Sequence, residues 1–125
     1  MISPGLHLSG LWPPFAEAVR YLLAWADSVG YQGELVSGYR SQGEQLRLYR
    51  IGRTLEQVRD RVSLQGRNGS VTDAWPGESP HQYGLAVDVE GPSQQPVVRL
   101  AHAIGFGTVS WDPAHVEWPN WRRLL

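Results

Sequence analysis

The stretch SPHQYGLAVD, residues 79–88, carries the strongest structural signal in this sequence of 125 residues. It places His81 just before an apolar run and Asp88 inside that run, between two valines, which predicts a buried β-strand. Because side chains alternate along a strand, Gly84, Ala86 and Asp88 are expected on one face, where small residues let a metal or a neighbouring backbone approach closely. A buried carboxylate needs a partner, and a metal ion is one candidate.

A second polar cluster lies in WDPAHVEW, residues 111–118. If the chain is extended there, His115 and Glu117 point the same way, and Asp112 precedes His115 across a proline turn. The sequence has no cysteine, so a transition-metal site must use histidine and carboxylate ligands. Two histidines and one carboxylate leave a fourth tetrahedral position for water, and a further carboxylate could accept that water's proton. Taken alone, a histidine in a polar loop is usually a solvated or hydrogen-bonded side chain.

The remaining pattern predicts one α+β domain over residues 1–125, with no internal repeat and no linker. In chain order we expect a helix from Pro13 that ends at Gly30, a strand over 34–37, a helix capped by Ser41, a helix capped by Thr54 over 55–62, a long loop over 63–80, a strand over 85–89, a helix over 97–104 and a final strand within 110–118.

The composition and the distribution of charged and apolar residues argue against several classes of protein. All 11 basic residues are arginine, and 12 acidic residues give a net charge of −1, which argues against a general nucleic-acid binder. The longest apolar run, residues 21–26, is far shorter than the roughly 20 residues of a membrane span. The first residues lack the features of a signal peptide. Residues 40–67 are locally basic, which fits either a solvated helical face or attraction to an anionic polymer.

Three motifs in order resemble a known enzyme group. Residues 79–88 match the S-x-H-x-x-G-x-A-x-D motif of zinc peptidases that cut peptidoglycan stem peptides, namely VanY-like D,D-carboxypeptidases and phage-endolysin L-alanyl-D-glutamate endopeptidases. Residues 112–117 resemble their later D/E-x-x-H motif, and residues 37–49 resemble the upstream segment with arginine, glutamine and Leu-Tyr. The resemblance implies a small α+β domain of the Hedgehog/D,D-peptidase type, with an antiparallel sheet flanked by helices. We expect residues 1–125 to form a single zinc peptidase catalytic domain with no separate wall-binding module.

The resemblance also implies roles for the central residues. His81, Asp88 and His115 would bind one Zn²⁺ ion. Asp112 would be the catalytic acid/base that activates water and then protonates the leaving amine. Arg40 would hold the substrate or the developing oxyanion, which suits its fixed fork of donors.

Three further residues receive supporting roles by the same resemblance. Ser79 and Gln45 match positions near the substrate. Glu117 matches a partner of a ligand histidine, outside the metal's own ligand set, and it is also the rival candidate for the base.

The implied activity is zinc-dependent hydrolysis of a peptide bond in peptidoglycan stem peptides. Our main expectation is an endolysin-type L-alanyl-D-glutamate endopeptidase, and the alternative is a D-alanyl-D-alanine carboxypeptidase. A second alternative is a non-catalytic zinc-binding module of the Hedgehog type, but the presence of Asp112 argues against it. We expect a monomer without nucleic-acid partners or membrane insertion, made in the cytoplasm and acting on the cell wall after release, with periplasmic or secreted action as the alternative.

Overall fold

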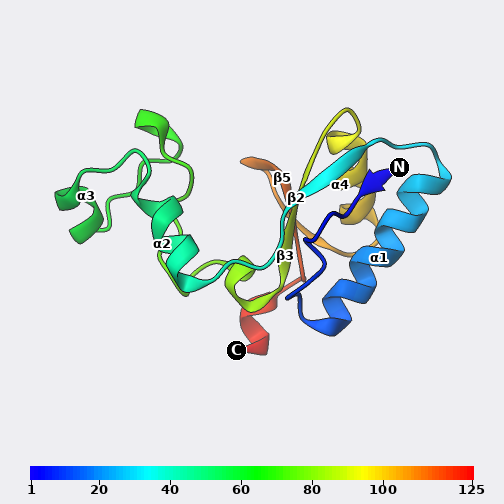
Figure 1. The fold of residues 1–125 in the computed structure, drawn as a ribbon, viewed down its shortest axis with the longest axis horizontal. Coiled ribbons are helices and arrows are strands. Elements are labelled where there is room, and N and C mark those ends of the chain that lie inside the picture. Colours follow the sequence, from blue (N-terminus) through cyan, green and yellow to red (C-terminus); the bar gives the residue numbers. More distant parts are fainter.

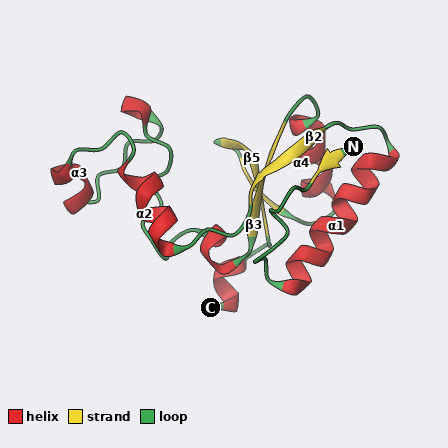
Figure 2. Ribbon diagram, in the orientation of Figure 1, coloured by secondary structure: helices red, strands yellow, loops and turns green.

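A computed structural model describes residues 1–125 and centres on a five-stranded sheet with the order β1-β2-β3-β5-β4 (Figures 1 and 2). The strands are β1 (Ile2–Ser3), β2 (Gly33–Ser37), β3 (Ala86–Glu90), β4 (Gly107–Val109) and β5 (Asp112–Glu117). All pairings are antiparallel except that of β1, which runs parallel to β2. The prediction of an α+β domain with an antiparallel sheet flanked by helices is confirmed, and β1 adds one parallel pairing at the edge of that sheet. Two residues are too few to show an alternating pattern, so β1 was not expected.

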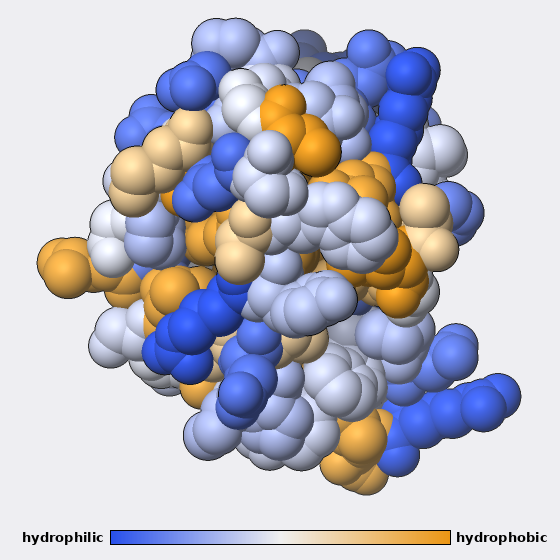
Figure 3. Space-filling view, turned by 90° about the vertical axis from the view of Figure 1, so that its right-hand side faces the viewer, coloured by the Kyte–Doolittle hydropathy of each residue, from blue (hydrophilic) through white to orange (hydrophobic).

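Two helices cover one face of the sheet: α1 (Pro13–Ser28) and α4 (Gln94–Ala103) (Figure 1). The core lies between them and the strands, and its fully buried members include Phe15, Val19, Leu22, Val87, Val89, Val97 and Val116. Burying each such side chain stabilises the fold by about 1.5–3 kcal/mol. Seen from this side, the surface is largely hydrophilic, with apolar patches between the polar side chains (Figure 3). The two helices therefore turn their apolar sides inward, as the spacing of α1 predicted.

Helix α4 begins three residues earlier than the sequence suggested. The predicted start was Val97, but the helix already includes Pro96 in its first turn. Proline is tolerated there because the first N–H groups of a helix have no partner within it. The Gln94 side chain also donates a hydrogen bond to the Val89 carbonyl at 2.8 Å, which ties the start of the helix to β3.

A lobe formed by residues 42–78 projects from the opposite side of the sheet (Figure 1). It contains α2 (Gln42–Arg50), α3 (Leu55–Arg59) and the short 3₁₀ turn η1 (Arg67–Gly69). The caps by Ser41 and Thr54 are confirmed, since each hydroxyl accepts the backbone N–H three residues later. Helix α3 is shorter than the predicted 55–62, because the chain leaves helical geometry and turns left-handed at Arg61, where φ is 51°.

A buried arginine holds the long loop of this lobe in place. The Arg53 guanidinium is fully buried, donates to the Tyr49 and Thr72 carbonyls at 2.8 Å each, and pairs with Asp73. Asp73 also accepts the backbone N–H groups of residues 64 and 65 at 2.9 and 3.0 Å. The predicted loop over residues 63–80 is therefore fixed by the hydrogen bonds and the ion pair of Asp73, although it contains no long helix or strand.

We expect Asp73→Asn to lower the free energy of unfolding at pH 7 by about 1–2 kcal/mol, a figure reduced because Asp73 is one-third exposed. Burial opposes ionisation, but hydrogen bonds from the loop backbone, Ser63 and Arg53 lower the pKa of Asp73 to about 2. This stabilisation is present above the unfolded-state pKa near 3.8 and is lost as pH falls through about 2. Urea unfolding across pH 2–7 measures both effects. Asp60→Asn, at an exposed surface pair, is the control and should change stability by less than about 0.5 kcal/mol.

None of the helices combines the length and the apolar character that crossing a membrane would require.

Candidate metal centre

Three side chains from different elements meet on the sheet face that α1 and α4 leave uncovered. His81 comes from the 3₁₀ turn η2 (Pro80–Tyr83), Asp88 from β3 and His115 from β5. One potential ligand atom from each lies within 4.8 Å of the others. Asp88 and His115 are directly paired across the sheet, so the strand register itself brings them together.

The turn η2 fixes the position and tautomer of His81. The Ser79 hydroxyl caps the turn by accepting the His81 backbone N–H at 3.3 Å. The His81 ring donates from Nδ1 to the Gly38 carbonyl at 2.7 Å, so Nε2 carries the free lone pair. That Nε2 atom lies 3.4 Å from Asp88 Oδ2. A backbone carbonyl therefore orients the His81 ring so that Nε2 faces the cluster.

Gly38 is a residue whose part in the site the sequence did not reveal. Its carbonyl accepts the His81 ring, and a Cβ on Gly38 would lie 2.3 Å from the His7 carbonyl oxygen. Glycine is thus required for the backbone of residue 38 to come so close to residue 7. The only hint in the sequence was the glycine itself at the end of a predicted strand.

The expected placement of Gly84 on the same strand face as Asp88 is wrong. Gly84 precedes β3 and ends η2 in the left-handed region, with φ of 68°. A Cβ there would lie 2.6 Å from the Trp12 backbone nitrogen and 2.8 Å from the Gly10 carbonyl oxygen. The small residue therefore admits a neighbouring backbone, which was one of the two options that the sequence left open.

His115 is held from both sides of its ring. Nδ1 lies 3.4 Å from Asp88 Oδ1, and Nε2 contacts Glu117 Oε1 at 2.7 Å. Glu117 therefore lies behind the ring, on the edge opposite Asp88. An Nε2–H donated to Glu117 turns Nδ1 toward the cluster, an arrangement in which a carboxylate orients a metal-binding histidine.

The charged groups in the cluster shift one another's pKa values. Burial alone would raise the pKa of Asp88, but His115 and His81 outweigh it and hold the pKa of that carboxyl below its ordinary range. Burial likewise opposes the charged form of His115, yet Asp88 and Glu117 raise its pKa to about 9. Asp88 Oδ1 is buried without a hydrogen bond of good geometry. An unsatisfied buried carboxylate oxygen beside two imidazole nitrogens fits the donor set of a zinc site with an open position.

Arg40 supplies a positive charge against this cluster. Its guanidinium donates to Asp88 Oδ2 at 3.0 Å and to the Ser37 hydroxyl at 3.2 Å, and it lies 3.4 Å from the Gln45 amide oxygen. Gln45 is fully buried and donates to the Ala74 carbonyl at 2.8 Å. Gln45 and the buried Ser79, both expected near the substrate, thus have their hydrogen bonds directed to the chain itself.

Asp112 stands at the rim of the cluster. Its side chain is 45% exposed, and Oδ2 lies 4.0 Å from His115 Nδ1, the ring edge that also faces Asp88. Oδ1 accepts the Ala114 backbone N–H at 3.3 Å. The expected proline turn between Asp112 and His115 is wrong, because Pro113 lies inside strand β5. Asp112 and Glu117 therefore occupy opposite edges of the His115 ring, and only Asp112 is on the side of the potential ligand atoms.

The close packing at Gly84 gives a stability prediction. We expect Gly84→Ala to lower the free energy of unfolding by at least about 2 kcal/mol, because it adds a steric clash to the cost of a left-handed alanine. Gly66→Ala is a matched control: its φ is 80°, and nothing lies within 4 Å of a Cβ there. Chemical denaturation measures both variants. Equal losses in the two would contradict the close backbone approach at Gly84.

Comparison with known proteins identifies a matching family. The family described as VanY, D-alanyl-D-alanine carboxypeptidase, matches residues 9–116, a range that includes all three potential ligands. A Bacillus subtilis (strain 168) protein named "Putative carboxypeptidase YodJ" is 37% identical over 79 residues, which cover 62% of this chain and 26% of that protein. The chain thus spans about a quarter of the length of this curated relative.

Solved structures share the fold at low sequence identity. The LdcB LD-carboxypeptidase superposes with a TM-score of 0.64 at 23% identity, covering 94% of this chain and 64% of that one. VanYB in complex with D-alanine-D-alanine gives 0.63 at 19%, covering 88% and 72%. A mutant of the D,D-pentapeptidase VanY in complex with Zn(II) gives 0.61 at 20%, covering 94% and 79%. With the family match extending over most of its length, the chain belongs to the VanY family of D-alanyl-D-alanine carboxypeptidases.

Proposed function

We propose that this chain is a zinc-dependent D,D-carboxypeptidase that removes the terminal D-alanine from peptidoglycan stem peptides. The observation that carries the proposal is the cluster of His81, Asp88 and His115, two nitrogen donors and one carboxylate, inside the region that matches the VanY family. We assign these three residues as the ligands of one zinc ion. When bound, zinc supplies Lewis-acid polarisation of the scissile carbonyl and makes water in the site more acidic.

We assign the role of acid/base to Asp112. Its carboxylate is on the ligand side of His115 and is open to solvent, so it can take a proton from the attacking water and deliver it to the leaving amine. Glu117 is assigned to orient His115 through the 2.7 Å contact at Nε2. This division of roles rests on the opposite edges of the ring that the two carboxylates occupy.

We assign substrate anchoring to Arg40. The terminal carboxylate of a D-alanyl-D-alanine substrate is an anion, and a guanidinium fork binds carboxylates in a bidentate manner. Arg40 lies beside Asp88 and is kept in place by Ser37 and Gln45. Gln45 then acts as a positioning residue that links Arg40 to the loop at Ala74.

The family match supports the choice of bond. Our main expectation from the sequence was an L-alanyl-D-glutamate endopeptidase, and the match to D-alanyl-D-alanine carboxypeptidases supports the alternative better. From this proposed substrate we infer that the protein acts at the cell wall. Mass spectrometry of a stem pentapeptide treated with zinc-loaded protein distinguishes the two activities. We expect a mass loss of one D-alanine, and a new N-terminal D-glutamate would instead favour the endopeptidase.

A further inference from the structure

The fully buried side chain of Arg53 lies in the lobe, outside the ligand cluster, and no step of the proposed reaction uses it. Its guanidinium lies over the Tyr49 ring, 4.0 Å from the centroid, and donates to the Tyr49 carbonyl of α2 and to the Thr72 carbonyl of the loop. A buried cation is costly unless its hydrogen bonds are satisfied, and here they join two separate segments. Arg53 therefore acts as a clamp between the end of α2 and residues 72–73.

Gln45 bridges the same two segments about one helical turn before Tyr49. Its side chain is fully buried, and its amide nitrogen donates to the Ala74 carbonyl at 2.8 Å and lies 3.4 Å from the Thr72 hydroxyl. The Thr72 hydroxyl also accepts the Ala74 backbone N–H at 3.1 Å. Thr72 thus faces Arg53 with its carbonyl and Gln45 with its hydroxyl, so it connects the two bridges.

The acceptors on the loop determine which end of the Gln45 amide meets Arg40. With the amide nitrogen directed at the loop, the amide oxygen lies 3.4 Å from the Arg40 guanidinium. A flipped amide would place its NH₂ group against that guanidinium, donor against donor, and its oxygen against the Ala74 carbonyl. Because Gln45 is fully buried, these groups would have no water to bond instead. Arg40 therefore keeps this partner only while the loop keeps its position.

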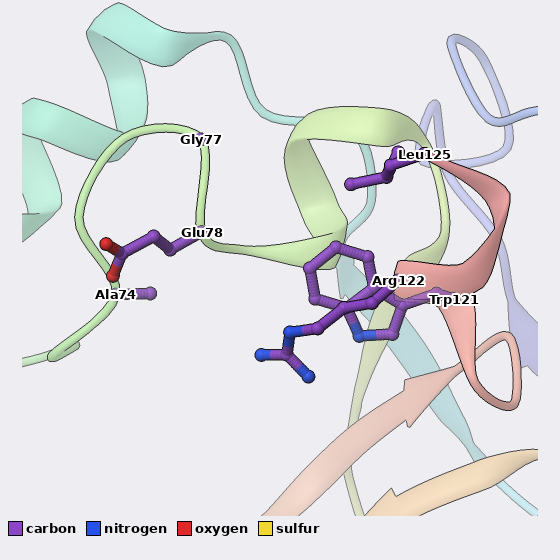
Figure 4. Close-up of a pocket in the computed structure, with 6 residues that line it drawn as sticks. All are labelled: Ala74, Gly77, Glu78, Trp121, Arg122 and Leu125. Carbon is purple, nitrogen blue, oxygen red and sulfur yellow. The ribbon is translucent and has the colours of Figure 1, made fainter.

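The loop at Ala74 borders open space on its other side. Ala74 lines an open pocket of about 520 Å³, across from the C-terminal 3₁₀ turn η3 (Trp121–Leu124) (Figure 4). The hydrogen bonds of Ala74 itself are those to Gln45 and Thr72. The position of the Ala74 carbonyl therefore depends on how the loop is held against α2, and the Arg53 clamp holds it two residues away.

We propose that Arg53 is a positioning residue for Arg40. It holds the loop acceptors that orient Gln45, and Gln45 in turn supports the Arg40 guanidinium beside Asp88. The inference rests on the proposed function for what Arg40 does, but not for where Arg40 lies. Arg53→Lys is the main test variant, because lysine keeps the charge but lacks the planar fork that reaches two carbonyls and a carboxylate at once.

Proton exchange at the Arg40 side chain measures how firmly it is held. Its Nε–H donates to the Ser37 hydroxyl at 3.2 Å and gives a nitrogen-15 NMR signal that is assigned by its loss in Arg40→Gln. The exchange rate is measured in protein with one equivalent of Zn²⁺ and divided by that of backbone N–H groups in β3, which corrects for any general loss of stability. We expect Arg53→Lys to raise this ratio at least about fivefold.

Arg67→Lys is the matched control, since Arg67 holds the same loop through the Leu64 carbonyl at 2.8 Å, away from Thr72. It should leave the ratio within about twofold of the wild type. Thr72→Val should raise the ratio and Thr72→Ser should not, because serine keeps the hydroxyl that faces Gln45. An unchanged ratio in Arg53→Lys, or in Thr72→Val if Arg53→Lys does not fold, would overturn the proposal, and so would an equal rise in Arg67→Lys.

Hydrolysis separates this inference from the proposed function. Arg53→Lys should raise KM for a stem pentapeptide about three- to tenfold with kcat within about twofold, because a loosened Arg40 weakens ground-state and transition-state binding alike. If the exchange ratio changes as predicted but the wild type releases no D-alanine, the proposed function fails and the positioning role stands. If the wild type releases D-alanine and the ratio is unchanged, the positioning role fails and the proposed function stands.

Discussion

Asp112→Asn is expected to lower kcat for D-alanine release by about 10²- to 10⁴-fold while the protein keeps its zinc. The asparagine retains the size of the side chain and can keep the contact to the Ala114 N–H, but it cannot take a proton from water. Steady-state hydrolysis of a stem pentapeptide, together with elemental analysis of bound zinc, measures the two quantities. KM should change little, because the substitution removes an interaction needed only in the transition state.

Glu117→Gln is the matched control, because it removes a carboxylate from the other edge of the same histidine. It should weaken zinc binding by about 10- to 100-fold, as expected for the loss of a partner that orients a ligand, and leave kcat largely intact at saturating zinc. If Glu117→Gln abolished turnover at full zinc occupancy and Asp112→Asn did not, the assignment of the base to Asp112 would be wrong.

His115→Ala is expected to weaken zinc binding by at least about 100-fold and to abolish hydrolysis at any practical zinc concentration. The substitution removes one of only three donors in the cluster and leaves Asp88 with less compensation for its burial. Competition with a chromogenic chelator measures the affinity, and circular dichroism verifies that the variant is folded.

His102→Ala serves as the control for histidine removal. His102 lies on α4, where its ring contacts the Thr108 hydroxyl at 3.1 Å, and it does not belong to the cluster. The His102→Ala substitution should leave both zinc affinity and hydrolysis unchanged. Wild-type zinc affinity in His115→Ala would contradict the ligand assignment.

The sequence predicted the elements that have a clear periodic or capping signal. Helix α1, with its apolar spacing from Phe15, and the run around Asp88 lie where they were expected. Strands β1 and β4 were missed, since two or three residues show no alternation and are stabilised by pairing with β2 and β5. Gly84 was misplaced because its left-handed conformation depends on the backbone of residues 10–12, far away in the sequence.

In the site, too, contacts between residues close in the sequence were expected, whereas contacts between distant segments were not. His115 and Glu117 were expected to point the same way from strand alternation, and their side chains are 2.7 Å apart. The pairing of Arg40 with Asp88 joins residues 48 positions apart and depends on the register of β2 with β3, which includes an irregularity after Leu35. Hydrogen bonds such as that of His81 to the Gly38 carbonyl involve backbone groups that every residue has. The identity of the residue therefore does not indicate them in the sequence.

The proposed zinc-dependent release of D-alanine is tested by measuring zinc content and bond specificity on the same sample. Protein loaded with zinc is incubated with a stem pentapeptide, with and without a chelator, and the products are identified by mass spectrometry. We predict one zinc ion per chain, release of a single terminal D-alanine, loss of that release with the chelator, and its recovery when zinc is restored. Release of D-alanine that persists in chelator-stripped, zinc-free protein, or an intact peptide in the presence of protein with one bound zinc, would contradict it.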